Sequence, residues 1–296
     1  MSPKSWMIAV GALALVSCEE PYDFEGELPA RLLLETRIAA GQPPAVSLRA
    51  VDGFGSTLPG DDLASAFVTI RDGGDDDRLI ELASLGTDGG DVAHFVAPER
   101  DIAVAGLRYS LRVDAVGYAP LSSTTTVPGA ARVTLGAGST QQLTTDTTAG
   151  TVGLPFTLRD ASPADEYYHV LVRGYESGAS EASIVAQPSI AFALADVDNA
   201  TVSSSYGGLL FPDEAFVGGQ LATSLLVPRA ALAAYATPVL RVEVRTVSAG
   251  YFNHYTSDSP KPGTGGAPAV STERVVGGLG FFGSYNAVVT DVELDF

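Results

Sequence analysis

Cys18 is the only cysteine in the chain, and its thiol is the side chain best suited to a covalent modification. It directly follows Leu15-Val16-Ser17, the end of an apolar stretch that begins at Trp6 and has Lys4 ahead of it. A bilayer span needs ~20 apolar residues, so this shorter stretch predicts a cleaved export signal. A lone cysteine in an exported protein has no disulfide partner, and we therefore expect the thiol to be modified.

The four residues from Leu15 to Cys18 resemble a lipobox, at which a bacterial cell attaches lipid to the cysteine and cuts just before it. On this interpretation residues 1–17 are a lipoprotein signal peptide and Cys18 is the lipid attachment site. Several acyl chains on one cysteine bury CH₂ groups at ~0.8 kcal/mol each, which anchors a protein without a spanning helix. The alternative is an ordinary signal peptide that happens to contain a cysteine.

Residues 18–27 form a short acidic tether after the cysteine, and its proline and glycine disfavour a helix. Acidic residues directly after a lipidated cysteine resemble the surface-export signal of Bacteroidota-type lipoproteins. A solvated spacer is the alternative interpretation. The residues predicted to form the export signal are Glu19, Glu20, Asp23 and Glu25.

Gly278-Leu-Gly280-Phe-Phe-Gly283 fits the G-x-G-x-x-G pattern of dinucleotide-binding loops. That site needs a helix directly after the loop and an acidic residue about 20 positions further on. The residues that follow Gly283 are few, and they alternate as in a strand. We therefore expect a strand bent by glycines, or a bulge, and no nucleotide cofactor.

The remaining polar clusters do not form a recognisable active site. Asp72, Asp75, Asp76 and Asp77, and separately Asp88 and Asp91, lack the register of a calcium loop, and hairpin turns explain them better. His94, His169 and His254 lack metal-ligand spacing, and the G-x-S-x-G motif of serine hydrolases is absent. We therefore expect no catalytic residues, no metal, no cofactor and no enzymatic activity.

The charge of the chain limits its partners. The full sequence has 17 basic and 35 acidic residues. The predicted signal peptide carries only Lys4, so the mature chain has 16 − 35 = −19 charges. Nucleic acids and anionic lipid surfaces require clusters of Lys and Arg, so we expect the membrane to be reached through the lipid anchor alone and no nucleic acid to be bound.

Short alternating segments separated by Gly, Asp and Pro turns predict a mainly β fold. We expect an immunoglobulin-like β-sandwich over residues 28–130 and a second β-rich domain over residues 131–296, both sandwich-like. In the second domain, Pro228–Tyr235 and a segment capped by Ser248 are predicted to be short helices. The predicted strands are 31–38, 45–51, 66–70, 79–83, 92–96, 109–116, 124–127, 152–158, 167–173, 239–247 and 287–296.

Aromatic residues near the C-terminus form a candidate partner surface. Successive side chains of a strand point to opposite faces, so Phe281 and Phe282 are expected to separate. One should enter the core of the second domain, and the other should face outward or meet the helix after Ser248. The residues of this candidate surface are Tyr251, Tyr255, Phe281, Phe282 and Tyr285.

Together with several further motifs, the lipobox and acidic tether resemble the Bacteroidota outer-membrane lipoprotein family defined by domain of unknown function 4249. Gly250 and Phe282 depart from the pattern expected of that family. The resemblance implies a lipoprotein anchored in the outer membrane, which the acidic tether predicts to face the cell exterior. The motifs are Leu32-Leu-Leu-Glu-Thr36, Tyr167-Tyr168, Phe211-Pro-Asp-Glu214, Ser248–Tyr255 and Gly277–Tyr285.

The family is often encoded beside a TonB-dependent receptor and has no assigned catalytic residues. From this resemblance we expect an accessory or binding partner of a TonB-dependent transporter in nutrient uptake. A surface adhesin or glycan-binding module that acts alone is the second reading, and a divergent hydrolase is the third.

Overall fold

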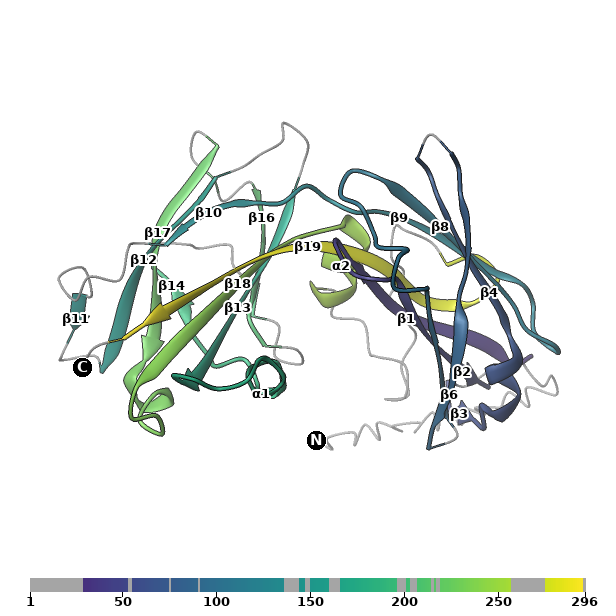
Figure 1. The fold of residues 1–296 in the computed structure, drawn as a ribbon, viewed down its shortest axis with the longest axis horizontal. Coiled ribbons are helices and arrows are strands. Elements are labelled where there is room, and N and C mark those ends of the chain that lie inside the picture. Colours follow the sequence, from purple (N-terminus) through teal and green to yellow (C-terminus); the bar gives the residue numbers. More distant parts are fainter. Residues whose placement is uncertain are drawn as a thin grey trace, which may run out of the picture.

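The structure, a computed structural model, contains a large mixed sheet and two smaller sheets. Figure 1 shows an arch whose two limbs are joined by β19, the last strand. Strands β1 to β9 form the N-terminal half and strands β10 to β18 form the C-terminal half. The structure describes residues 29–52, 55–74, 76–89, 91–135, 144–146, 150–159, 166–195, 201–202, 207–213, 216, 219–256 and 275–294.

The large sheet has ten strands and runs through both halves. All neighbouring strands in it are antiparallel except β1 and β19, which pair in parallel with Leu33 opposite Leu279. The order is β15 (Thr201–Val202), β16 (Leu209–Pro212), β13 (Tyr167–Glu176), β18 (Pro238–Val247), β19 (Leu279–Glu293), β1 (Arg31–Ala39), β2 (Ala45–Val51), β7 (Val92–Val96) and β6 (Ala83–Asp88), with β3 (Thr57–Leu58) beside β2.

One smaller sheet packs on each half of the large sheet. The four-stranded sheet of the N-terminal half is ordered β5 (Leu79–Glu81), β4 (Phe67–Asp72), β8 (Arg108–Asp114) and β9 (Leu121–Thr126). The five-stranded sheet of the C-terminal half is ordered β10 (Arg132–Leu135), β12 (Thr151–Arg159), β17 (Gln220–Pro228) and β14 (Ala193–Leu194), with β11 (Thr144–Asp146) beside β12.

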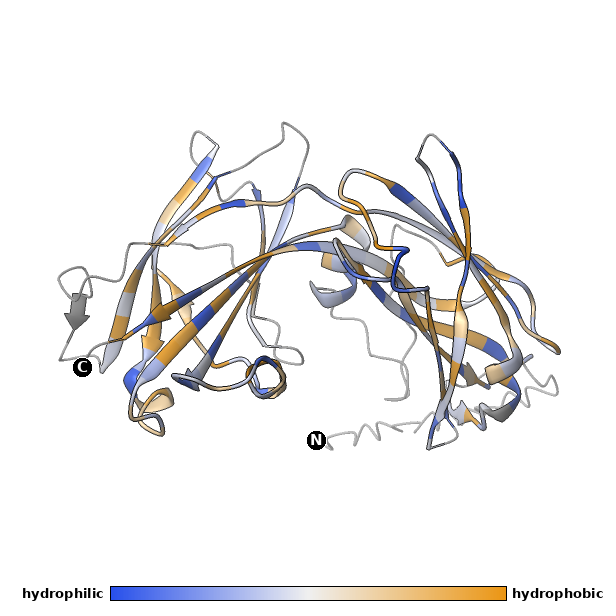
Figure 2. Cartoon of the chain, viewed as in Figure 1, coloured by the Kyte–Doolittle hydropathy of each residue, from blue (hydrophilic) through white to orange (hydrophobic). Residues whose placement is uncertain are grey.

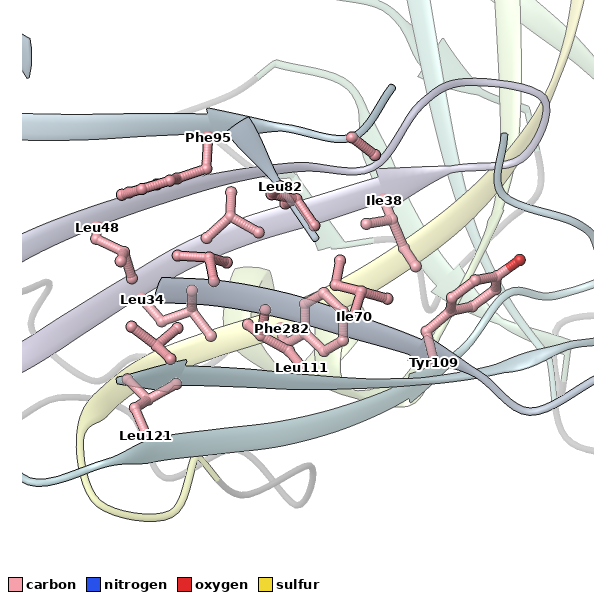
Figure 3. Close-up of a cluster of buried hydrophobic side chains, with 14 of the residues drawn as sticks. Leu34, Ile38, Leu48, Ile70, Leu82, Phe95, Tyr109, Leu111, Leu121 and Phe282 are labelled. Atoms are coloured by element: carbon pink, nitrogen blue, oxygen red, sulfur yellow. The ribbon is translucent and has the colours of Figure 1, made fainter. Parts of the chain in front are cut away.

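Each half has its own hydrophobic core between its two sheets. Hydrophobic and hydrophilic residues alternate along many strands in Figure 2, as expected where one face of a strand is buried. In Figure 3, Phe282 of β19 lies among side chains of the N-terminal core, near Ile70 and Leu111. Further along the same strand, Val292 belongs to the C-terminal core.

These core residues of β19 have even numbers, so both smaller sheets cover the same face of the large sheet. We call the opposite face the inner face, because Figure 1 shows the helices α1 (Glu181–Ala186) and α2 (Ala249–Thr256) on the inner side of the arch. Odd-numbered residues of β19 point to this side. A Cβ atom added to Gly283 would lie 3.1 Å from the Cβ atom of Tyr251 in α2.

The glycine-rich motif is part of β19, as expected of a strand bent by glycines. Gly280 has φ of +97°, and a Cβ atom there would lie 1.9 Å from the carbonyl oxygen of Leu34 in β1. Only glycine permits this backbone conformation together with so close an approach. The motif therefore places β19 against β1 rather than binding a nucleotide phosphate.

The expectation of a mainly β chain with two sandwich-like parts and short helices is confirmed. Ser248 caps α2, since its hydroxyl accepts a hydrogen bond from the backbone N–H of Tyr251 at 3.3 Å. The helix predicted over Pro228–Tyr235 is wrong. Pro228 is extended and ends β17, and only the 3₁₀ turn η3 (Arg229–Ala231) follows before the chain returns into β18.

Two further features differ from the predicted elements, while the domain boundary after residue 130 stays a prediction. The segment predicted as a strand over 79–83 divides between β5 and β6, which belong to different sheets. Helix α1, which the sequence pattern did not suggest, begins after Ser180, whose hydroxyl accepts from the N–H of Ser183. The 3₁₀ turn η1 (Asp61–Ser65) lies in the N-terminal half.

Candidate functional site

A groove of about 250 Å³ lies on the inner face where the N-terminal half meets α2. Alternation in β1 explains its lining: Leu32 and Leu34 enter the core, while Glu35 and Arg37 point to the opposite face. The groove is lined by Leu33, Glu35, Arg37, Ser47, Arg49, Asp88, Val92, His94, Tyr255 and Phe281.

The strand register places these residues in neighbouring rows. Glu35 lies opposite Phe281 across the parallel β1–β19 pair. Leu33 lies opposite Arg49 across the antiparallel β1–β2 pair, so Glu35, two residues further on, is a diagonal neighbour of Arg49. Ser47 lies opposite His94 across the next pair. Four strands therefore bring both charges and a histidine to one place.

His94 is held by two polar neighbours at one side of the groove. Its Nδ1 atom lies 3.1 Å from the hydroxyl of Ser47, and its Nε2 atom lies 3.3 Å from Asp88 Oδ2. A carboxylate only accepts hydrogen bonds, so Nε2–H donates to Asp88, while the Ser47 hydroxyl shares a hydrogen bond with Nδ1. Both ring nitrogens of His94 thus have partners within the protein.

Glu35 and Arg49 differ from their neighbours. Both are half-buried, and neither has a hydrogen bond or ion pair with the described residues. Withdrawing a charged group from water costs free energy unless a partner compensates it. The Glu35 carboxylate can therefore accept hydrogen bonds from a ligand, and the Arg49 guanidinium can donate hydrogen bonds to it.

The aromatic side of the groove is closed rather than open. Phe281 is 3% exposed and stacks on His254 with ring centroids 3.8 Å apart. The ring of Tyr255 meets Phe281 edge-on at 5.8 Å, and the Arg37 guanidinium carbon lies 6.0 Å from its centroid.

A buried polar network fixes α2 beside the groove. His169 of β13 is 1% exposed, and its Nε2–H donates to the carbonyl oxygen of Gly207 at 2.9 Å, since a carbonyl can only accept. Nδ1 therefore accepts from the hydroxyl of Tyr251 at 2.8 Å, and that oxygen accepts from Arg245 at 3.2 Å. Burial lowers the pKa of His169 to about 4, and the positive charge of Arg245 acts in the same direction.

The same network continues as an ion-pair cluster across β13 and β18. Glu243 accepts from both Arg173 and Arg245 at 2.6 Å. Burial alone would raise the pKa of Glu243, but the two guanidinium groups outweigh it and hold that pKa below its ordinary value. Arg245 also lies 4.5 Å from the ring centroid of Tyr285. These contacts give α2 a fixed place on the inner face.

Three of the five residues of the candidate partner surface are buried. Tyr251 and Phe282 are fully buried and Phe281 is nearly so, because α2 covers β19 on one face and the N-terminal core covers it on the other. Only Tyr255 and Tyr285 are partly accessible. Phe281 and Phe282 do point to opposite faces, but Phe282 enters the N-terminal core instead of the core of the second domain.

The other sequence-predicted residues have structural roles or lie outside the described residues. Asp72 pairs with Arg78 at 3.3 Å and Asp77 with Arg71 at 2.8 Å, both within the β4–β5 hairpin. The lipid attachment site and the export signal lie outside the described residues, as does Asp75. The lipid attachment site is Cys18, and the export signal consists of Glu19, Glu20, Asp23 and Glu25.

Sequence reasoning missed Glu35, Arg37, Ser47 and Arg49. The only signal in the sequence was the presence of charged residues at alternate positions of two strands, which solvent-facing strands also show. Among the described residues, no group of three or more His, Cys, Asp or Glu side chains could hold a metal ion. Within the same ranges, no helix has the length and apolar character needed to cross a membrane.

Comparisons with known proteins identify a family. A search of curated proteins finds no match. Among solved structures, the chain is similar to a mutant of Salmonella alpha-2-macroglobulin, with 12% sequence identity and a TM-score of 0.25. That match covers 90% of this chain but only 15% of the macroglobulin. The family described as domain of unknown function (DUF4249) matches residues 19–291, so the chain belongs to this family.

Proposed function

We propose that this protein is a lipid-anchored outer-membrane lipoprotein that faces the cell exterior and assists a TonB-dependent transporter in nutrient uptake. The observation that carries the proposal is that the family match begins at residue 19, directly after Cys18. The match thus covers most of the chain that cleavage at the lipobox would release. Lipid on Cys18 would hold it at a membrane.

The groove favours a second candidate, a surface binding module that acts without a transporter. Glu35 and Arg49 are available to a ligand whether or not a transporter is present. Both candidates require the same anchor, and they differ in whether a second protein is bound. Copurification from native outer membranes separates them, since only the first predicts recovery of a transporter with the wild-type protein.

The experiment begins with the anchor. Cys18→Ser should give unprocessed or soluble protein, because lipid on Cys18 is the proposed attachment to the bilayer. Ser17→Ala is the matched control, since it keeps a small residue before the cysteine and should leave processing unchanged. Outer-membrane fractionation after a high-salt wash is the measurement. Retention of Cys18→Ser in the membrane fraction would contradict the proposed anchor.

A second arm tests orientation. Replacing the four acidic tether residues with Ala should leave the protein lipidated but protected from protease added to intact cells. Exchanging Glu for Asp and Asp for Glu keeps the charges and serves as the control. Equal protease accessibility of the Ala variant and the wild type would reduce the tether to a spacer. The four residues are Glu19, Glu20, Asp23 and Glu25.

A further inference from the structure

The groove contains two opposite charges that do not neutralise each other. Glu35 and Arg49 are diagonal neighbours on adjacent strands, which places their backbones about 7–8 Å apart. Both are half-buried and both line the groove, yet they form no ion pair with each other or with any described residue. A ligand with complementary charges could therefore pair with both.

We infer that this groove binds a small zwitterion, with the ligand's carboxylate on Arg49 and its ammonium on Glu35. A guanidinium pairs with a carboxylate through two parallel N–H···O bonds, and a carboxylate accepts charge-assisted N–H bonds from an ammonium. The ligand class is therefore a free amino acid or a short peptide whose two charged ends both fit the groove.

The overall charge of the groove supports a ligand of zero net charge. Two guanidinium groups and two carboxylates line it, so the charges of its Arg, Asp and Glu side chains balance. A purely anionic ligand would meet Glu35 and Asp88, and a purely cationic one would meet Arg37 and Arg49. A molecule that carries both signs avoids both repulsions.

The aromatic residues argue against a neutral sugar. Sugars that bind proteins through aromatic rings need an open ring face. Phe281 is buried and stacked on His254 here, while Tyr255 packs against Tyr251 at 4.6 Å and has Arg37 over its ring. The rings therefore build the wall of the groove rather than a stacking platform, and charge recognition is left as the main source of affinity.

The size of the groove limits the ligand. Its volume of about 250 Å³ is below the roughly 300–1,000 Å³ of sites for drug-sized molecules. Leu33 and Val92 line the groove, are largely buried and give an apolar surface for the aliphatic part of a ligand. A single amino acid or a dipeptide matches this volume and lining.

The test uses the detergent-purified mature protein and isothermal titration calorimetry. The probes are leucine, N-acetyl-leucine, leucinamide, dileucine and glucose, after each common amino acid has been screened by thermal shift. We expect a zwitterion to bind and each blocked analogue to bind about 10- to 100-fold more weakly, as expected for loss of one charged hydrogen-bonded contact. Tighter binding of dileucine than of any amino acid would identify a peptide as the ligand.

Variants assign the contacts. Glu35→Gln should weaken zwitterion binding by a similar factor and make affinity indifferent to N-acetylation, while Arg49→Gln should make it indifferent to amidation. Glu81→Gln and Arg108→Gln, on strands of the four-stranded sheet, are matched controls that should bind as the wild type does. Melting temperatures show that each variant is folded, and a variant that does not fold is replaced by Glu35→Asp or Arg49→Lys, for which a partial loss is expected.

The inference fails if no amino acid or dipeptide binds at millimolar concentration, if blocked and free ligands bind equally, or if glucose binds in preference. It does not rest on the proposed transporter, since the purified protein is tested alone. A failure here leaves the lipid anchor and the partner untouched, and a failure of copurification leaves the groove untouched.

Discussion

The two halves of the molecule complete their cores in different ways. The core of the N-terminal half contains Phe282 from the last strand, and Ser284 of the same strand lies 3.0 Å from Thr125 through their hydroxyl oxygens. Among the residues that the structure describes, the core of the C-terminal half contains only residues from Ala131 onward. The difference indicates that the N-terminal half remains incomplete until the end of the chain has joined it.

The largest expected effect comes from separating the halves. Residues 28–130 alone lack β19, so β1 loses its parallel neighbour and the core loses Phe282. We expect this fragment not to unfold cooperatively, while residues 131–296 retain a cooperative transition. Circular dichroism during thermal unfolding measures both. If the fragment 28–130 melts cooperatively near the melting temperature of the intact protein, the N-terminal half does not depend on β19 for its fold.

Gly280→Ala should have the next largest effect. The added methyl group would meet the Leu34 carbonyl at 1.9 Å, in a backbone conformation with φ of +97°. Gly86→Ala is the matched control, because Gly86 has φ of +91° but nothing within 4 Å of the added atom. The control should lose about 1–3 kcal/mol of unfolding free energy.

We expect Gly280→Ala to lose clearly more than Gly86→Ala in urea denaturation, since it adds a clash with β1 to the same conformational cost. Equal losses would mean that the close approach of β19 to β1 contributes little to stability.

His169, in the C-terminal half, should have a smaller effect on the free energy of unfolding, confined to acidic pH. Its pKa is lowered to about 4 from 6.5 by burial, so the unfolded state binds more protons than the folded state between these values. The associated stability is complete above pH 6.5 and is lost as the pH falls through 4. The full loss is about 3 kcal/mol.

His169→Gln should flatten this part of the stability profile, measured as the midpoint of urea unfolding at each pH. Arg245 and Glu243 also face the ring, and both are present in the variant and in the wild type, so the difference between the two isolates His169. His94→Gln, at a half-exposed site, is the control. A variant with the same slope as the wild type would show that the buried histidine does not titrate as described.

The strands could be predicted from alternation because burial on one face gives a period of two. The segment 45–51 coincides with β2, and 31–38 falls within β1. The C-terminal segment predicted over 287–296 extends back to Leu279, because glycines at 280 and 283 permit pairing with β1 and packing under α2. Propensity alone counted against a strand there.

The candidate site could not be predicted, since no local motif encodes it. Glu35 and Arg49 come together only because β1 and β2 pair in one register, and a shift of β2 by one residue would turn Arg49 toward the core. The placement of β19 between the halves could not be predicted from the sequence either. It depends on contacts between residues about 250 positions apart, and sequence periodicity reports only local structure.

Hydrogen exchange of Phe282→Ala tests the asymmetry between the halves most directly. Removing this side chain should cost about 3–5 kcal/mol in a core of this kind. The account predicts loss of amide protection in β4 and β8, with protection in β12 and β17 retained, whereas Phe281→Ala should instead affect α2. Equal loss in both halves, or no loss in β4 and β8, would contradict it.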